Sequence, residues 1–105
     1  MPRRSDIRLV FCQRLKEARE RCRLSQKQLG LRAGLDQFVA STRINRYERG
    51  IHEPDLATVA RLAEALKVPV AYLFAEDERL ANMILAFDRL TASEKDKLLK
   101  ELGER

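Results

Sequence analysis

Hydrogen-bonding side chains crowd the segment from Gln37 to Arg49, and their types are those that contact nucleic-acid bases and phosphates. An arginine can donate two parallel hydrogen bonds to guanine, and an asparagine or glutamine can pair in the same way with adenine. Serine and threonine hydroxyls can bind base edges or phosphate oxygens. The candidate residues are Ser41, Thr42, Arg43, Asn45, Arg46 and Arg49, and Gln37 joins them if the helix that carries them starts early.

A short helix ahead of this segment is predicted by its end signals. Ser25 and Gln28 have the spacing of a capping box, so a helix should run from Gln26 to about Ala33. Gly34 can adopt the left-handed conformation that ends it. Two short helices joined by such a turn are how a small protein inserts a helix into the major groove of DNA.

The start of the second helix has two interpretations. Either Asp36 caps it and the helix begins at Gln37, or the turn is longer and the helix begins near Ala40. We prefer the early start, because Asp36 is the better cap. The helix should end near Arg49, before Gly50. Its apolar side would consist of Phe38 or Val39, Ile44 and Tyr47.

Five further helices are predicted from apolar periodicity and capping residues. They lie near residues 5–22, 56–66, 69–75, 78–90 and 92–102. The first is capped by Ser5 or Asp6, the second by Asp55 and the last by the capping box of Thr91 with Glu94. The helix after Asp55 should bury a broad stripe made of Leu56, Val59, Ala60, Leu62, Ala63 and Leu66.

The basic charge is concentrated in the first half of the chain. Residues 1–50 carry 13 Lys and Arg against 5 Asp and Glu, whereas residues 51–105 carry 8 against 11. A basic half favours a polyanionic partner, because neutralising phosphates releases condensed counterions. Ordinary solvated surface charge is the alternative explanation. Arg3 and Arg4 either stay in a solvated tail, which we favour, or reach a neighbouring DNA groove.

Catalytic chemistry has little support in the sequence. The only histidine, His52, falls in a predicted loop, and neither cysteine has a histidine near it. No glycine-rich phosphate loop or metal-ligand spacing is present in the sequence. We therefore expect that the protein is not an enzyme and that it binds no metal, cofactor or small-molecule substrate.

The cysteines and the apolar pattern point to a cytoplasmic protein. Cys12 and Cys22 would lie about 15 Å apart along one predicted helix, too far for a disulfide, so both should be reduced. No apolar run approaches the roughly 20 residues that a membrane span needs. The first residues also lack the apolar stretch of a signal peptide.

Residues 11–75 resemble the lambda-repressor-like helix-turn-helix domain of the Cro/repressor (XRE-type) family of transcription regulators. The resemblance implies an all-α fold, in which residues 1–75 form a five-helix DNA-binding domain and residues 76–105 a C-terminal two-helix extension. The residues that carry it are Leu15, Arg19, Leu24, Ser25, Gln26, Leu29, Ala33, Gly34, Ile44, Tyr47, Glu48, Gly50, Pro54, Leu62, Ala63 and Leu66.

The resemblance also implies roles for single residues. Gln26 is similar to the family glutamine that holds a DNA phosphate at the start of the second helix, so it would position the protein without specifying sequence. Arg19 and Glu48 are similar to a pair that locks the DNA-reading helix in place. Between Gly34 and Ile44 the chain has nine residues, four more than usual in the family. The extra turn lengthens either the reading helix or the loop before it.

The last two helices carry more apolar surface than water tolerates on isolated helices. They either form a two-fold interface, which we favour, or fold back on the first and fifth helices. A homodimer suits a reader of two half-sites about 34 to 36 Å apart. The residues concerned are Leu80, Met83, Ile84, Phe87, Leu90, Leu98, Leu99 and Leu102.

These features together predict a sequence-specific regulator, a repressor, that binds a pseudo-palindromic operator in double-stranded DNA as a homodimer. One alternative is an antitoxin or phage-immunity autoregulator that also binds a protein partner. A second is a helical protein-interaction or RNA-associated module without an operator.

Overall fold

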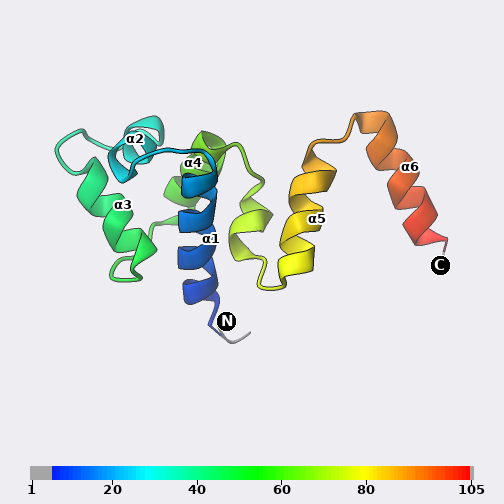
Figure 1. The fold of residues 1–105 in the computed structure, drawn as a ribbon, viewed down its shortest axis with the longest axis horizontal. Coiled ribbons are helices and arrows are strands. Elements are labelled where there is room, and N and C mark those ends of the chain that lie inside the picture. Colours follow the sequence, from blue (N-terminus) through cyan, green and yellow to red (C-terminus); the bar gives the residue numbers. More distant parts are fainter. Residues whose placement is uncertain (1–5, 105) are drawn as a thin grey trace.

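The computed structural model describes residues 6–104, and these residues form helices joined by turns, without a strand (Figure 1). The elements are α1 (Ile7–Arg21), α2 (Gln26–Arg32), α3 (Ala40–Glu48), α4 (Leu56–Leu66), the 3-10 helix η1 (Val70–Phe74), α5 (Glu78–Asp88) and α6 (Ala92–Gly103). The predicted all-α class is confirmed, although the expected fifth helix is the 3-10 helix η1. The predictions for Arg3, Arg4 and Ser5 lie outside the described residues.

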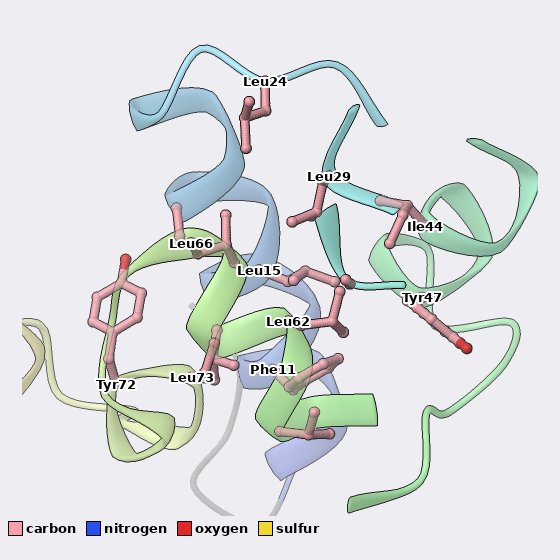
Figure 2. Close-up of a cluster of buried hydrophobic side chains, with 14 of the residues drawn as sticks. Phe11, Leu15, Leu24, Leu29, Ile44, Tyr47, Leu62, Leu66, Tyr72 and Leu73 are labelled. Atoms are coloured by element: carbon pink, nitrogen blue, oxygen red, sulfur yellow. The ribbon is translucent and has the colours of Figure 1, made fainter. Parts of the chain in front are cut away.

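One hydrophobic core joins α1, α2, α3, α4 and η1 (Figure 2). Leu15, Leu29 and Leu62 are completely buried in it, and Ile44 anchors α3 against them. Removing a side chain of this size from water contributes about 1.5 to 3 kcal/mol. The core therefore fixes the orientation of α3 through its apolar side.

Several predicted helix ends are confirmed by hydrogen bonds. The Ser25 hydroxyl accepts from the Gln28 amide while the Gln28 side chain accepts from the Ser25 amide, which completes the capping box of α2. Thr91 and Glu94 do the same for α6. Asp55 caps α4 by accepting from the Thr58 amide at 2.8 Å.

The stripe predicted for α4 is wrong at two positions. Leu56 is 81% exposed and Ala60 is also exposed, whereas the polar Thr58 is buried. Leu56 lies in the first turn, directly after the capping Asp55, where the helix has only begun to meet the core. The remaining stripe residues are buried as predicted.

The preferred early start of α3 is wrong, because the helix begins at Ala40. The Asp36 carboxylate accepts a hydrogen bond from the Phe38 amide at 2.8 Å, so it stabilises a turn and does not cap a helix. Ala40 is completely buried against Gly30, where an added Cβ would lie 2.6 Å from the Ala40 Cβ. This close approach of α2 and α3 sets the position of Ala40, and the extra residues lengthen the turn.

The apolar side of α3 differs from the prediction for the same reason. Phe38 and Val39 are exposed, since they precede the helix, and Ala40 packs in the core together with Ile44 and Tyr47. The expected end is confirmed, because Arg49 closes the helix and Gly50 has a positive φ of 73°.

The molecule is elongated because α6 stands away from the core. Its principal extents are 51, 30 and 23 Å, and its radius of gyration is 15.1 Å, compared with about 13 Å for a compact chain of this length. The turn between α2 and α3 lies at one end of the long axis and α6 at the other (Figure 1). No residue of α6 is buried.

Cys12 and Cys22 are free thiols, as predicted; Cys12 is buried and Cys22 is exposed. Among the residues that the structure describes, no helix has the length and apolar character required to cross a membrane.

Candidate nucleic-acid interface

One side of α3 packs in the core and the other presents polar side chains to solvent. Ala40, Ile44 and Tyr47 define the buried side. Successive residues of a helix are rotated by about 100°, so residues three or four positions apart share a side. The side opposite the core therefore carries Thr42, Asn45, Arg46 and Arg49. Thr42, Arg46 and Arg49 are exposed and Asn45 is half-buried. This side combines hydroxyl, amide and guanidinium groups, which can donate hydrogen bonds to acceptors on the base edges.

Arg43 and Ser41 lie on the flanks of this polar side. Arg43 lines a hollow together with Tyr47, Asp55 and Thr58, between α3 and the start of α4. Hydrogen bonds from the Thr58 side chain and amide lower the pKa of the Asp55 carboxyl below its ordinary value of 3.8, and the charge of Arg43 adds a smaller effect. Arg43 is exposed, so it faces both solvent and this carboxylate.

Gln37 is exposed in the turn before α3 and is not part of the helix. Its predicted place on the reading helix depended on the early start, which the structure contradicts. The turn still brings Gln37 near the amino end of α3, because only Phe38 and Val39 separate it from Ala40.

Arg19 of α1 holds α3 through Glu48, as the resemblance implied. Arg19 Nη2 donates to Glu48 Oε1 at 3.1 Å, and Arg19 Nε donates to the other carboxylate oxygen. The side chains are 14% and 4% exposed. The hydrogen bonds to Glu48 raise the pKa of Arg19 above its ordinary value and outweigh burial, which lowers it.

Gln26 belongs to the same cluster. Its Nε2 donates to Glu48 Oε1 at 3.1 Å, so the start of α2 is joined to the end of α3. A side-chain amide carries two N–H donors, and this bond takes up one of them. The side chain predicted to hold a phosphate is therefore itself oriented by the pair that fixes α3.

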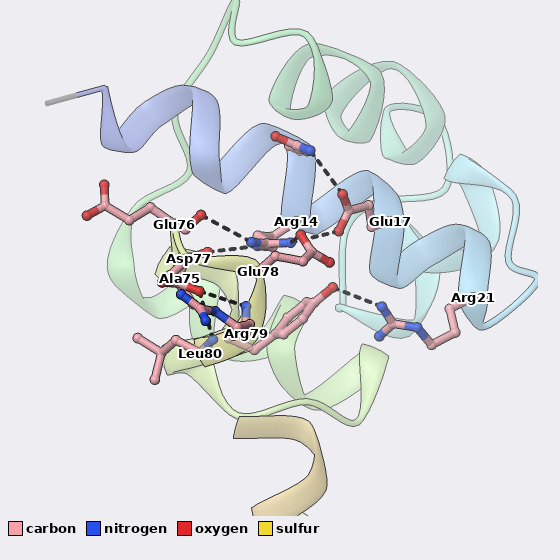
Figure 3. Close-up of polar contacts among 11 residues, drawn as sticks. Arg14, Glu17, Arg21, Ala75, Glu76, Asp77, Glu78, Arg79 and Leu80 are labelled. Atoms are coloured by element: carbon pink, nitrogen blue, oxygen red, sulfur yellow. Dashed lines mark hydrogen bonds and ion pairs between the residues drawn. The ribbon is translucent and has the colours of Figure 1, made fainter. Parts of the chain in front are cut away.

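Arg14 of α1 is a residue that sequence reasoning missed. It is 3% exposed, and it donates to the Ala75 carbonyl at 2.8 Å, to Glu17 at 3.1 Å and to Glu78 at 3.0 Å (Figure 3). Burial lowers the pKa of Arg14, but the hydrogen bonds to Glu78 and Glu17 outweigh it and raise the pKa overall. Its spacing of four residues from the apolar Val10 was the available signal.

Comparison with known proteins identifies the arrangement. The sequence profile described as Helix-turn-helix matches residues 15–73, which include α2, the lengthened turn and α3. The chain belongs to the XRE-type helix-turn-helix family of transcription regulators. A search of curated proteins gives no match.

A solved structure extends the similarity beyond the family domain. It is entitled "Crystal structure of transcriptional regulator BswR" and is 44% identical in sequence, with a TM-score of 0.83. The match covers 90% of this chain and 93% of that one. Because the family profile ends at residue 73, coverage of this extent includes a large part of the C-terminal extension.

Proposed function

We propose that this XRE-type protein is a sequence-specific repressor that inserts α3 into the major groove of double-stranded DNA and binds a pseudo-palindromic operator as a homodimer. The observation that carries the proposal is the polar side of α3, which is exposed while Arg19, Glu48 and Gln26 hold the helix from behind. Occupying the groove excludes other proteins from the same site, which is the simplest route to repression.

The proposed DNA contacts fall into two kinds. Arg46 and Asn45 read base edges, Arg46 by paired donors to guanine and Asn45 by pairing with adenine, at about 1 to 3 kcal/mol of discrimination each. Gln26 holds a phosphate, and Arg49 lies over the backbone. Ser41, Thr42, Arg43 and Gln37 complete the proposed interface from the flanks of α3 and from the turn before it.

The proposed dimer forms through α5 and α6. A helix of 12 residues is marginal in water without packing, and α6 buries no residue in its own chain. Leu99 and Leu102 of α6 are exposed, as are Leu80 and Met83 of α5. Within the chain, Lys95 lies over the Phe87 ring at 5.5 Å and joins the two helices. A second copy supplies the same apolar face and satisfies two-fold symmetry.

Selection of bound sequences from a random duplex pool tests the DNA reading. We expect a pseudo-palindrome whose half-sites are one helical turn, or a multiple of it, apart. Arg46→Ala should relax the preference at particular bases, whereas Gln26→Ala should weaken binding similarly across sequences. Binding without any sequence preference at near-physiological salt would contradict the proposal.

The molar mass of the protein in solution tests the dimer. The wild type should sediment as a dimer and Leu99→Asp as a monomer, because a charge at the interface must be desolvated. Leu56→Asp is the matched control, since Leu56 is also an exposed leucine but lies on α4. A monomeric wild type would reject the homodimer and favour a different protein partner for this face.

A further inference from the structure

Phe38 is the most exposed of the large apolar side chains that the structure describes. It is 85% exposed, in the turn between α2 and α3, while Leu35 of the same turn is buried in the core. A phenylalanine in water leaves a large apolar surface without a partner. The chain thus directs Leu35 of this turn inward and Phe38 outward.

The backbone around Phe38 is held in place. Its amide donates to the Asp36 carboxylate at 2.8 Å, and the amide of Val39 donates to the Asp36 carbonyl at 3.1 Å. Two residues later Ala40 is locked against Gly30. Phe38 is therefore presented from an ordered turn.

The surroundings of Phe38 indicate which partner covers it. The turn precedes the amino end of α3, where Thr42 lies on the polar side and Ser41 on its flank. It also lies in the basic half of the chain. It projects at the end of the molecule farthest from α6, so the proposed dimer contact leaves it uncovered (Figure 1). A duplex entered by α3 is the partner that reaches this position.

We infer that Phe38 is a specificity-determining residue that contacts the C5-methyl group of a thymine in the major groove. This inference rests on the proposed function, because it requires α3 to enter the groove. The thymine methyl is the apolar group that the major groove offers, and phenylalanine is among the side chains that contact it. Phe38 thereby adds recognition of A·T pairs beside the hydrogen-bond donors of α3.

Deoxyuridine provides the test, because it pairs as thymine does but lacks the methyl group. The selected operator is synthesised with each consensus thymine replaced in turn, and dissociation constants are measured for the full-length protein. For the wild type, uracil at one position in each half-site should weaken binding about fourfold, the value for losing one buried methyl-sized group. For Phe38→Ala, thymine and uracil at that position should bind equally.

Two comparisons separate this contact from other effects. Phe38→Ala should melt within a degree or two of the wild type, because the residue is 85% exposed. Leu56→Ala, which removes another exposed apolar side chain from α4, should keep the full thymine preference.

Each outcome bears on a different statement. A wild type that shows no sequence preference rejects the proposed function and this inference with it. A wild type that selects an operator but tolerates uracil at every position rejects the inference alone. A thymine preference that persists in Phe38→Ala also rejects it, because the methyl group is then read by another residue.

Discussion

Two arginines of α1 each hold another helix, and they do so in different regions of the molecule. Arg19 binds Glu48 at the end of α3, beside the proposed DNA interface, whereas Arg14 binds Glu78 at the start of α5, beside the C-terminal extension. Both guanidinium groups lie largely inside the protein. Their carboxylate partners differ, because the Glu48 side chain is 4% exposed and the Glu78 side chain is 59% exposed.

The difference separates two ways of fixing a helix. The pair at α3 is largely shielded from water, so each charge depends on its protein partners for the interactions that water would supply. At α5 the buried arginine also donates to the Ala75 carbonyl and to Glu17, and Glu78 retains its solvation. The reading helix should therefore be the more sensitive of the two to the loss of a single carboxylate.

Removing the Glu48 carboxylate should have the largest effect on stability. Glu48→Ala leaves the Arg19 guanidinium without its carboxylate partner and with the Leu24 carbonyl as its remaining acceptor, at a cost of about 3 to 5 kcal/mol in the free energy of unfolding. Arg46→Ala, on the exposed side of the same helix, should change it by less than about 0.5 kcal/mol. Chemical denaturation of both variants makes the comparison, and a larger loss in Arg46→Ala would contradict it.

Replacing Arg14 should come next. Arg14→Met keeps much of the side-chain volume but leaves the Ala75 carbonyl without its donor, at a cost of about 1 to 3 kcal/mol. The amides of α5 should also exchange faster with deuterium, because Arg14 joins this helix to α1. Unchanged protection of α5 would show that the other core contacts of the helix, such as buried Ala81, hold it alone.

The exposed carboxylate of the second pair should matter little. Glu78→Gln removes a charge that water solvates well, so we expect a loss of about 0.2 to 1 kcal/mol that shrinks at high salt. Denaturation at low and high salt measures it. A loss as large as that of Glu48→Ala would remove the distinction between the two regions.

Asp55 gives the smallest effect, which is confined to acid solution. Its pKa is lower in the folded protein, so its contribution to stability is complete above the ordinary value of 3.8 and disappears as the pH falls through the folded-state pKa. Asp55→Asn should stay close to the wild type at neutral pH, because asparagine also caps helices well. Below 3.8 it should lose less stability than the wild type does. Equal acid sensitivity in pH-dependent denaturation would contradict this.

Local signals in the sequence predicted most of the fold. The capping boxes of Ser25 with Gln28 and of Thr91 with Glu94 join residues three positions apart, so a short stretch of sequence is enough to recognise them. The Arg19 and Glu48 pair was reached through the family resemblance. The polar side of α3 was predicted from its alternation with Ile44 and Tyr47, and the helix displays it as expected.

Features that depend on distant contacts were missed. The start of α3 is set by the approach of Gly30 to Ala40, which capping preferences do not describe. Arg14 was not singled out, because its partners Ala75 and Glu78 lie more than 60 positions along the chain. Phe38 or Val39 was expected on the apolar side of α3 because apolar periodicity was extended into a turn, and both are exposed.

Because the molecule is elongated, a small change of angle at the Arg14 contact would move the ends of the molecule by a larger distance. The α6 helix and the α2–α3 turn lie at opposite ends of a 51 Å body, with the joint between α1 and α5 between them, so a tilt of about 10° at this joint would move one end by about 4 Å. Base pairs are stacked about 3.4 Å apart, so such a displacement exceeds one step along the duplex. In the proposed dimer, the rigidity of this joint would decide how strictly the spacing between half-sites is measured.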